Sequence, residues 1–258
     1  MRARHNPSPD LLNDRDSPMN EGLAALRRYR GRFAPTPSGP LHLGSLLTAL
    51  ASYLDARHHG GEWLLRIDDL DTLRCAPGAD HVILQQLETH GLYWDHSPRY
   101  QRQQGDEYRA RLADLQHRGC LYACRCTRAE LAASSLAGPD GPVYPGTCRA
   151  LHLASSGHAL RFASAQGAQT FDDLLLGTQV RDRETQIGDF VVRRRDGIIG
   201  YHLACAVDEH AQAITTVMRG GDLIGATFAQ LVLMDAWERP APQYAHLPLL
   251  VDREGRKL

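Results

Sequence analysis

The sequence predicts an α/β fold built on a parallel sheet, and three observations lead to this prediction. The 258 residues are 43% hydrophobic and 23% charged, which is ordinary for a globular protein with a sizeable core. A strand, a helix and a second strand follow one another between Gly31 and Ile67. Further strand patterns and a long helical pattern come after residue 158. Because a strand–helix–strand unit returns the chain in the same direction, its two strands pair in parallel.

The first unit has clear boundaries. "GRFA" (residues 31–34) predicts a short strand that ends at a proline-rich turn. From His42 to His59 apolar residues recur at helical spacing, and Gly60-Gly61 ends the pattern. "EWLLRI" (Glu62–Ile67) is typical of a buried strand, and the acidic turn "DDLD" follows it.

The rest of the chain continues the α/β pattern. Two helices are expected at Pro77–Thr89 and Asp106–Arg118, and a long one at Asp222–Trp237 after a glycine pair. Three strand-like runs lie between them: "ALRFAS" (159–164), "FDDLLLGTQV" (171–180) and "DFVVRR" (189–194).

Between Leu121 and about Ser156 the chain changes character. This stretch carries cysteines, glycines and prolines without long periodicity, which indicates a module inserted into the α/β domain. Residues before Tyr29 are polar and contain prolines, with a short helix expected at Glu21–Tyr29. The expected division is a disordered extension (1–28), an α/β domain in two pieces (29–100 and 157–258) and an inserted module (101–156).

Charge and hydropathy exclude some classes of protein. The formal net charge is −1, so no global basic field indicates nucleic-acid binding. "VVRRRDG" (Val191–Gly197) is the best local basic candidate, although three adjacent arginines are more often a solvated strand or turn. No apolar run approaches the ~20 residues of a membrane helix, and the N-terminus lacks the apolar middle of a secretory signal. We therefore expect a cytoplasmic protein without a membrane partner.

The stretch "RFAPTPSGPLHLGSL" (Arg32–Leu46) combines three prolines, two glycines and one histidine directly before a helix. A helix N-terminus offers unpaired N–H groups and the positive end of its dipole, and glycine lets a ligand approach the backbone. These are the physical parts of a phosphate site. The residues equally allow a rigid turn in which His42 is an ordinary helix cap.

Four segments carry a resemblance to a known family. "APTPSGPLHLGSL" resembles the first signature of class I aminoacyl-tRNA synthetases, "HIGH", which stands here as His42–Ser45. "LLRIDDLD" and "YHLACAVDEHAQAITTVMRGGDLIGATFAQ" (Tyr201–Gln230) resemble the glutamate branch, and the final "GRKL" matches the start of the "KMSKS" signature. The matches run in order from Arg30 to Leu258 and are most similar to the glutamyl-Q tRNA(Asp) synthetase family, a short paralog of glutamyl-tRNA synthetase.

The resemblance implies a fold and a reaction. It implies a doubly wound, Rossmann-like catalytic domain that binds its ligands at the carboxyl ends of the strands. The family activates L-glutamate with ATP, which brings its Mg²⁺, and transfers the glutamyl group to the queuosine base in the anticodon of tRNA(Asp). A monomer that binds the anticodon arm of this tRNA is expected.

The resemblance also implies roles for individual residues. His42, Gly44 and Lys257 carry the catalytic positions, and the same three with Ser45 bind ATP. Arginine suits a carboxylate because its planar fork donates two parallel hydrogen bonds. The glutamate site is expected to comprise two such arginines, a tyrosine, an acidic group for the ammonium, and the lining of the loop: Arg32, Arg219, Tyr201, Asp68, Phe33, Ala34, Pro35 and Thr36.

Two positions depart from the family pattern. The family usually has Arg-Ile-Glu-Asp where this chain has Arg66-Ile67-Asp68-Asp69, so the carboxylate of Asp68 is one methylene shorter. The chain also stops at Leu258, before the serine and second lysine of the "KMSKS" signature. We expect residues 1–258 alone to adenylate glutamate poorly, because that lysine steadies the ATP phosphates in the family.

Six cysteines are present, and three of them predict a metal site. Cys124-x-Cys126 and Cys148 have a plausible spacing for one structural zinc ion, and buried free thiols are the alternative. From the residues alone the fourth ligand stays open, with His152 and Cys120 chemically better than tyrosine. The resemblance, at "CxC…YxxxC", selects Tyr144. It also implies RNA contacts near the zinc, for which the candidates are Arg125, Arg128 and Arg149, each of which can equally be a solvated surface charge.

Two other functions compete with the anticodon-modifying enzyme. The first is a fragment of an ordinary glutamyl-tRNA synthetase that charges the tRNA 3′ end. The second, of a different class, is a non-catalytic relative that binds RNA or a nucleotide. The resemblance implies that the short paralog activates glutamate without tRNA, whereas the ordinary enzyme needs tRNA first, so an exchange assay separates them.

Overall fold

The structure is a computed structural model that describes residues 28–256. The expected N-terminal extension and most of the short helix at Glu21–Tyr29 therefore lie outside the described residues, as does Lys257. None of the described helices is both long and apolar enough to cross a membrane.

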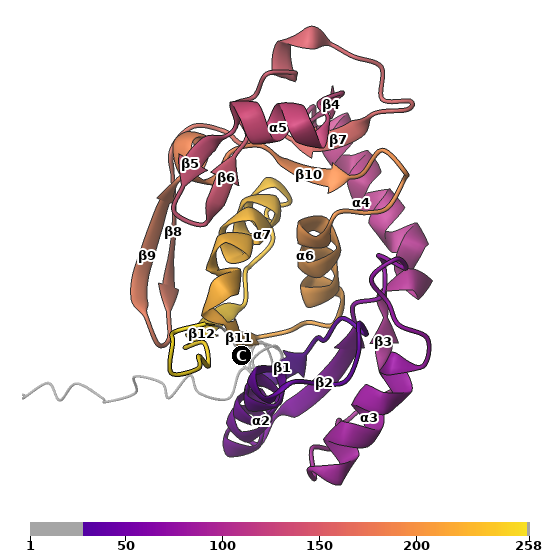
Figure 1. The fold of residues 1–258 in the computed structure, drawn as a ribbon, viewed down its shortest axis with the longest axis vertical. Helices are drawn as coiled ribbons and strands as arrows, with labels where there is room; N and C mark the ends of the chain where they lie inside the picture. The colour runs from indigo at the N-terminus through magenta and orange to yellow at the C-terminus, as the bar shows by residue number, and fades with distance from the viewer. Residues whose placement is uncertain (1–27, 257–258) are drawn as a thin grey trace, which may run out of the picture.

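The central sheet of the described residues has seven strands in the order β3-β2-β1-β11-β12-β8-β9. Their bounds are β1 Arg30–Phe33, β2 Glu62–Ile67, β3 Arg99–Tyr100, β8 Ala168–Asp173, β9 Gly177–Asp182, β11 Thr216–Gly220 and β12 Gln243–Leu247. Neighbouring strands run parallel from β3 to β8, and only β9 at the edge runs antiparallel. The predicted α/β class is confirmed, with a mixed sheet in place of a wholly parallel one (Figure 1).

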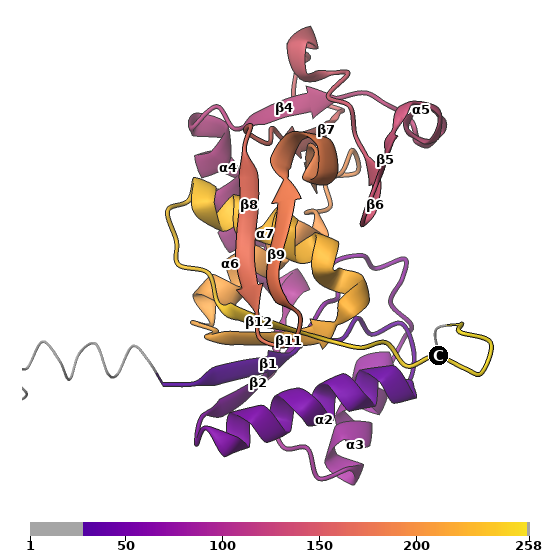
Figure 2. The same cartoon turned by 90° about the vertical axis from the view of Figure 1, so that its left-hand side faces the viewer.

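Helices cover both faces of β1, β2, β11 and β12, as in a doubly wound sheet (Figure 2). On one face lie α2 (Leu43–His58) and α3 (Ala79–Thr89), and on the other α6 (Tyr201–Ala211) and α7 (Ile224–Ala236). These bounds confirm the helices predicted at 42–59, 77–89 and 222–237. The helix expected at 106–118 is also confirmed, as α4 (Gly105–His117).

The first unit packs as its periodicity predicts. In α2 the residues Ala49, Ser52 and Ala56 face the sheet and are buried. Trp63 of β2 is fully buried, and its indole N–H donates to Ser52 Oγ at 2.9 Å. Small residues on the helix therefore make room for one large aromatic ring on the strand, which fixes the distance between α2 and the sheet.

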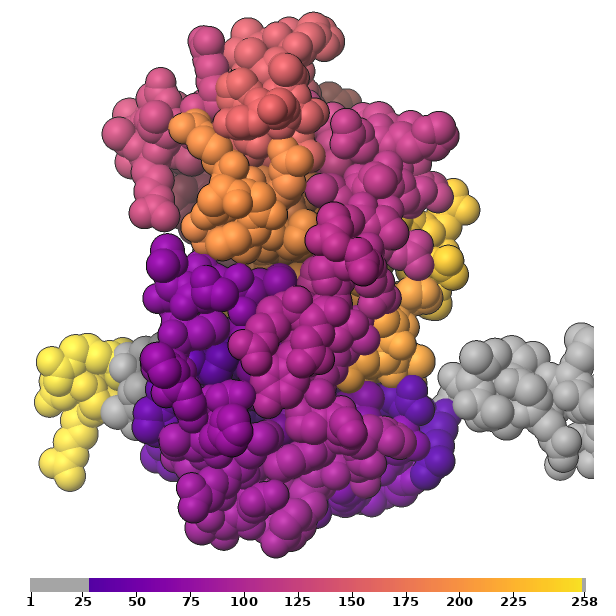
Figure 3. Space-filling model, turned by 90° about the vertical axis from the view of Figure 1, so that its right-hand side faces the viewer, coloured from indigo at the N-terminus to yellow at the C-terminus, as the bar shows by residue number. Residues whose placement is uncertain are grey.

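A second, antiparallel sheet lies at the far end of α6 and α7 (Figure 1). It consists of β4 (Leu121–Cys124), β7 (Ala159–Phe162) and β10 (Phe190–Arg193), in the order β10-β7-β4. In the space-filling view, residues of this central part of the chain form the upper end of the molecule and the N-terminal residues of the fold the lower end (Figure 3). The boundary expected after residue 156 falls between the paired strands β4 and β7, and the division into domains stays a prediction.

Short elements complete the chain between these sheets. They are α5 (Arg128–Ser134), the hairpin β5 (Leu136–Gly138) and β6 (Gly141–Val143), the 3₁₀ turns η1 (Gln101–Gln104), η2 (Arg149–Leu151) and η4 (Gly221–Leu223), and the π turn η3 (Arg183–Ile187). A capping box between Thr127 and Glu130 starts α5.

The single strand predicted for "FDDLLLGTQV" is wrong, because this stretch is the hairpin of β8 and β9. Leu174, Leu175 and Leu176 looked like the centre of a buried strand, but they form the turn and are 51–55% exposed. Gly177 ends the turn with φ 70°, a backbone conformation that favours glycine. No local pattern predicted α6, β11 or β12, and the residues of α6 and β11 entered the prediction only as part of a family match.

Candidate active site

A cavity of about 300 Å³ lies at the carboxyl ends of β1 and β11, beside the start of α2. Most of the residues predicted for glutamate and ATP line it: Arg32, Phe33, Ala34, Pro35, Thr36, His42, Gly44, Ser45, Tyr201 and Arg219. They come from four separate parts of the chain, so the fold, and not sequence proximity, brings them together. The cavity is where a doubly wound sheet places its ligands.

His42 is the N-cap of α2 and also faces the cavity. Its Nδ1 accepts from the backbone N–H of Ser45 at 3.3 Å, and its Nε2 lies 3.1 Å from Ser45 Oγ. A Cβ on Gly44 would lie 3.1 Å from the His42 ring, so glycine lets the imidazole fold back over the helix start. His42 can therefore cap the helix and contact a phosphate at the same time, because the capping contact holds its ring at the mouth of the cavity. The first turn of α2 holds no acidic residue, so its positive end is available to an anion.

Two arginines on the cavity wall are paired with carboxylates. Arg32 donates from Nε and from Nη2 to Glu209 Oε1, at 3.0 Å in both cases. Arg66 donates from Nε to Asp68 at 2.7 Å and from Nη1 to Glu209 at 3.3 Å. Burial by itself would raise the pKa of Glu209, but the charges of Arg32 and Arg66 outweigh it and hold the pKa below its ordinary value.

Arg219 differs from these two arginines. It is buried at 4% exposure, and no carboxylate of the described residues lies within ion-pair distance of it. Within that part of the chain its Nη1 also has no hydrogen-bond partner. A buried cation without a counter-charge is costly, and a carboxylate in the adjoining cavity would compensate it.

Asp68 lies behind the wall and is not among the residues that line the cavity. Its carboxylate accepts from Arg66, and its backbone N–H donates to the carbonyl of Pro35 at 3.0 Å. The part predicted for Asp68, binding the substrate ammonium, stays a prediction. As placed, Asp68 fixes Arg66 and ties the end of β2 to the loop after β1.

Sequence reasoning missed Arg66 and Glu209. A signal for Arg66 existed, because an arginine inside the buried strand "LLRI" needs a carboxylate partner. Glu209 comes from the third turn of α6, eight residues after Tyr201, and only the packing of α6 against the sheet shows that it reaches Arg32. Pairing across 177 residues leaves no local pattern.

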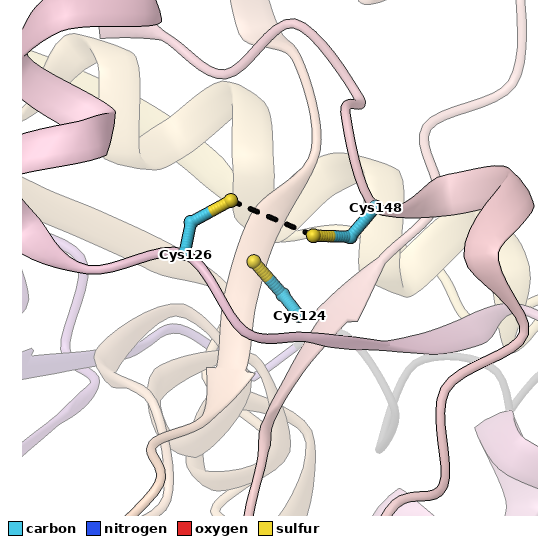
Figure 4. A group of neighbouring side chains, drawn as sticks. All are labelled: Cys124, Cys126 and Cys148. Atoms are coloured by element: carbon cyan, nitrogen blue, oxygen red, sulfur yellow. Dashed lines mark hydrogen bonds between the residues drawn. The ribbon is translucent and has the colours of Figure 1, made fainter.

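Three predicted zinc ligands gather at the end of β4. The Sγ atoms of Cys124, Cys126 and Cys148 all lie within 4.8 Å of one another, with Cys126 and Cys148 3.5 Å apart (Figure 4). The hydroxyl of Tyr144 lies 3.6 Å from Cys124 Sγ and 3.5 Å from Cys126 Sγ. Among the described residues, neither Cys120 nor His152 belongs to this group. Three thiols this close together are donors that fit zinc, and Tyr144 as the fourth ligand stays a prediction.

The electrostatics of this cluster favour a thiolate at Cys148, whereas burial raises the pKa of Cys126. Burial would raise the pKa of the Cys148 thiol, but hydrogen bonds from Tyr144, the backbone and the neighbouring thiols outweigh it and lower the pKa to about 7. The thiolate is the form that binds a metal. The backbone N–H of Cys148 donates to the Tyr144 hydroxyl at 2.9 Å, which positions the phenol toward the sulfurs.

Several arginines near the cluster are engaged within the protein. Arg149 forms an ion pair with Asp189, and Arg195 donates to the backbone carbonyl of Arg125. In "VVRRRDG", Arg193 donates to two carbonyls of the loop before β7, and Arg194 pairs with Asp71 and Asp196. These contacts indicate that the arginines of "VVRRRDG" hold neighbouring loops in place. The RNA contacts expected of Arg125, Arg128 and Arg149 stay predictions.

Comparison with known proteins supports the resemblance seen in the sequence. Residues 28–258 match the family model of the catalytic domain of class I tRNA synthetases for E and Q. The glutamyl-Q tRNA(Asp) synthetase of Methylococcus capsulatus is 46% identical over 232 residues, which cover 89% of this chain and 75% of the relative. The enzyme of the same name from Chromobacterium violaceum is 48% identical over 231 residues, covering 89% and 78%.

The chain belongs to the glutamyl-Q tRNA(Asp) synthetase family.

Membership of this family makes the chain a ligase of the class I synthetase type. A solved glutamate tRNA ligase from Elizabethkingia meningosepticum, in complex with its amino acid, superimposes with a TM-score of 0.78 at 30% identity. The match covers 90% of this chain but only 52% of that ligase. The catalytic fold of this chain is therefore similar to about half of a longer ligase.

Proposed function

We propose that this chain activates L-glutamate with ATP and transfers the glutamyl group to queuosine in the anticodon of tRNA(Asp). The observation that carries the proposal is Arg219, a buried guanidinium without a carboxylate partner among the described residues, on the wall of a cavity that also contains His42. The wall at Arg219 therefore suits an acidic amino acid, and the wall at His42 suits a phosphate. The names of the relatives at 46–48% identity supply the acceptor.

In this proposal each wall has a separate task. Arg219 and Arg32 hold the carboxylates of glutamate, with Arg32 kept in place by Glu209. The N–H groups at the start of α2, with His42 and Ser45, hold the triphosphate and its Mg²⁺ complex. A carboxylate oxygen of glutamate attacks the α-phosphorus of ATP, and pyrophosphate leaves. A hydroxyl of the acceptor then attacks the glutamyl carbonyl, and AMP leaves.

Positioning and charge compensation supply most of the catalysis, because both reactants are anions. The Rossmann-like part keeps the two binding walls rigid, and the zinc-bound module around Cys124 presents the acceptor RNA. One structural zinc ion held by Cys124, Cys126, Cys148 and Tyr144 fastens that module. A monomer that binds one anticodon arm is sufficient for this scheme.

The test is an exchange assay followed by a transfer assay. Glutamate-dependent exchange of pyrophosphate into ATP is measured without tRNA, for residues 1–258 and for a fusion that adds the remainder of the second signature from the Chromobacterium violaceum relative. Labelled glutamate is then offered with tRNA(Asp) that carries or lacks queuosine. We expect exchange without tRNA that is slow in residues 1–258 and faster in the fusion, and transfer only to the tRNA(Asp) that carries queuosine. Exchange that requires tRNA favours the ordinary synthetase, and glutamate binding without exchange in the fusion favours a non-catalytic relative.

A further inference from the structure

Arg219 is held by neutral groups on two neighbouring elements. On the parallel strands β11 and β12, Arg219 lies directly opposite His246 in the register. Its Nε donates to His246 Nε2 at 3.4 Å, and its Nη2 donates to the hydroxyl of Thr227 in α7. The hydroxyl of Thr227 in turn lies 2.8 Å from His246 Nε2. Two of the three guanidinium nitrogens are therefore used to fix the plane of the group, and Nη1 is left over.

Asp173 at the end of β8 sets the tautomer of His246. Its Oδ2 lies 2.6 Å from His246 Nδ1, and because a carboxylate only accepts, Nδ1 carries the proton. The other ring nitrogen, Nε2, then accepts from two donors, the Thr227 hydroxyl at 2.8 Å and the Arg219 Nε–H at 3.4 Å. Burial lowers the pKa of His246, and the nearby Arg219 charge adds to this against the raising effect of Asp173, so the ring stays neutral. The side chains of Asp173 and His246 are both completely inaccessible to solvent.

We propose that Asp173 and His246 are a positioning pair that orients the guanidinium of Arg219 for the substrate carboxylate without neutralising its charge. The inference rests on the proposed function, in which Arg219 binds that carboxylate. A carboxylate of the protein placed directly on Arg219 would compete with the substrate carboxylate for the guanidinium group. A neutral imidazole fixes the same geometry and does not neutralise the positive charge of Arg219. The negative charge of Asp173 stays one ring further away from the guanidinium.

Asp173→Asn is the sharpest variant, because its amide has only one arrangement that keeps the turn. Asp173 Oδ1 already accepts from the backbone N–H groups of Leu175 and Leu176, at 3.0 Å each. The carbonyl of asparagine takes that place, so its NH₂ faces His246 Nδ1. The ring must then carry its proton on Nε2, which places a donor against the Arg219 Nε–H. We expect Arg219 to turn away from the cavity while the size and shape of residue 173 stay the same.

The measurements are calorimetric binding of L-glutamate, the KM values for glutamate and ATP in exchange, and the His246 tautomer by long-range ¹H–¹⁵N NMR. Asp173→Asn is expected to weaken glutamate binding about 10-fold or more, to leave the KM for ATP within about 2-fold, and to move the proton from Nδ1 to Nε2. His246→Gln, whose amide oxygen can accept from Arg219, should restore most of the affinity that His246→Leu loses. A merely structural role predicts equal losses of affinity for glutamate and for ATP, even where the tautomer changes.

Matched variants of Thr227 keep the inference testable if Asp173→Asn fails to fold. Thr227→Val removes the hydroxyl that holds Arg219 Nη2 and should weaken glutamate about 10-fold, whereas Thr227→Ser should stay within about 2-fold. Unchanged glutamate affinity in folded Asp173→Asn, or equal affinities in the two Thr227 variants, overturns the inference. Absence of glutamate binding by the unaltered protein instead overturns the proposed function, so the two failures are distinguishable.

Discussion

The guanidinium of Arg32 and the carboxylate of Glu209 form a buried ion pair in which Nε and Nη2 both lie 3.0 Å from Oε1. The side chains are 5% and 1% exposed. Arg66 reaches the same oxygen at 3.3 Å, so one carboxylate of α6 holds an arginine of β1 and an arginine of β2. This contact joins the helix that begins at Tyr201 to the two strands that end at the cavity.

Removing Glu209 should therefore destabilise the protein strongly. Glu209→Ala leaves two buried guanidinium groups around an empty site, and we expect a loss of about 3–5 kcal/mol in the free energy of unfolding. Urea titration followed by circular dichroism measures it. Asp114→Ala is the control, because Asp114 and Arg118 form an ion pair that is 34% and 42% exposed and should contribute less than about 1 kcal/mol. Similar losses in the two variants would contradict the prediction.

Arg219 should control the affinity for glutamate. Arg219→Leu removes a buried cation and up to two charge-assisted hydrogen bonds to a carboxylate, each worth about 1.5–3 kcal/mol, so the KM for glutamate should rise about 100-fold or more. Arg219→Lys keeps the charge but not the fork, and we expect about a 10-fold rise. Pyrophosphate exchange at saturating ATP gives both values, and Arg118→Leu at the C-cap of α4 is the control. A KM that does not change in Arg219→Leu would remove the basis of the proposed function.

Local patterns predicted much of the fold. The helix at 42–59 and the strand at Glu62–Ile67 appear within a residue of their expected ends, because helical spacing, a glycine pair and a buried apolar run are all local signals. The turn at Leu174–Leu176 was missed because three consecutive leucines favour a buried strand, and only the pairing of β8 with β12 decides which residues are covered. Tertiary contact there overrides the local pattern.

Local patterns likewise predicted some residues of the candidate site and missed others. The loop from Arg32 to Ser45 could be predicted because its prolines, glycines and histidine stand together in the sequence. Glu209, His246 and Asp173 could not, because each contacts a partner that lies far away along the chain: Arg32, Arg219 and His246 respectively. Residues that bind a ligand are visible in motifs, whereas the residues that orient them emerge only from the register of neighbouring strands and helices.

The cysteine cluster should hold one zinc ion per chain. Protein purified without chelator is expected to contain about one equivalent by atomic emission, and Cys124→Ser to contain almost none, because a structural site needs its full ligand set. Tyr144→Phe should lower the zinc content in the same direction, while Cys75→Ser, outside the cluster, should not change it. An unchanged zinc content in Tyr144→Phe would mean that Tyr144 is not the fourth ligand and would favour His152 or Cys120.

Gly200 should not tolerate a side chain. A Cβ there would lie 2.3 Å from the carbonyl oxygen of Val191, so Gly200→Ala must push the start of α6 away from β10 and move Tyr201 with it. We expect a loss of about 1–3 kcal/mol in stability together with weaker glutamate binding. Gly105→Ala is the matched control, because its Cβ would meet only the flexible guanidinium of Arg109 at 3.1 Å and would favour the helix by up to about 1 kcal/mol. Chemical denaturation of both variants compares them, and an equal effect would show that α6 can shift freely.

His202 should make the stability of the protein depend on pH below neutrality. Burial, with a smaller contribution from the Arg219 charge, lowers the pKa of His202 from 6.5 to about 4, and its Nδ1 has no hydrogen-bond partner among the described residues. Between these two values the unfolded chain binds a proton that the folded protein excludes, so stability is complete above pH 6.5 and falls as the pH is lowered, by about 1.4 kcal/mol per unit and about 3 kcal/mol in all. His202→Gln has no imidazole, so its unfolded chain no longer binds this proton. Urea unfolding at pH 7, 6, 5 and 4 should therefore show a slope that is shallower in His202→Gln by close to one proton, and parallel slopes would mean that His202 is protonated in the folded protein as readily as in the unfolded chain.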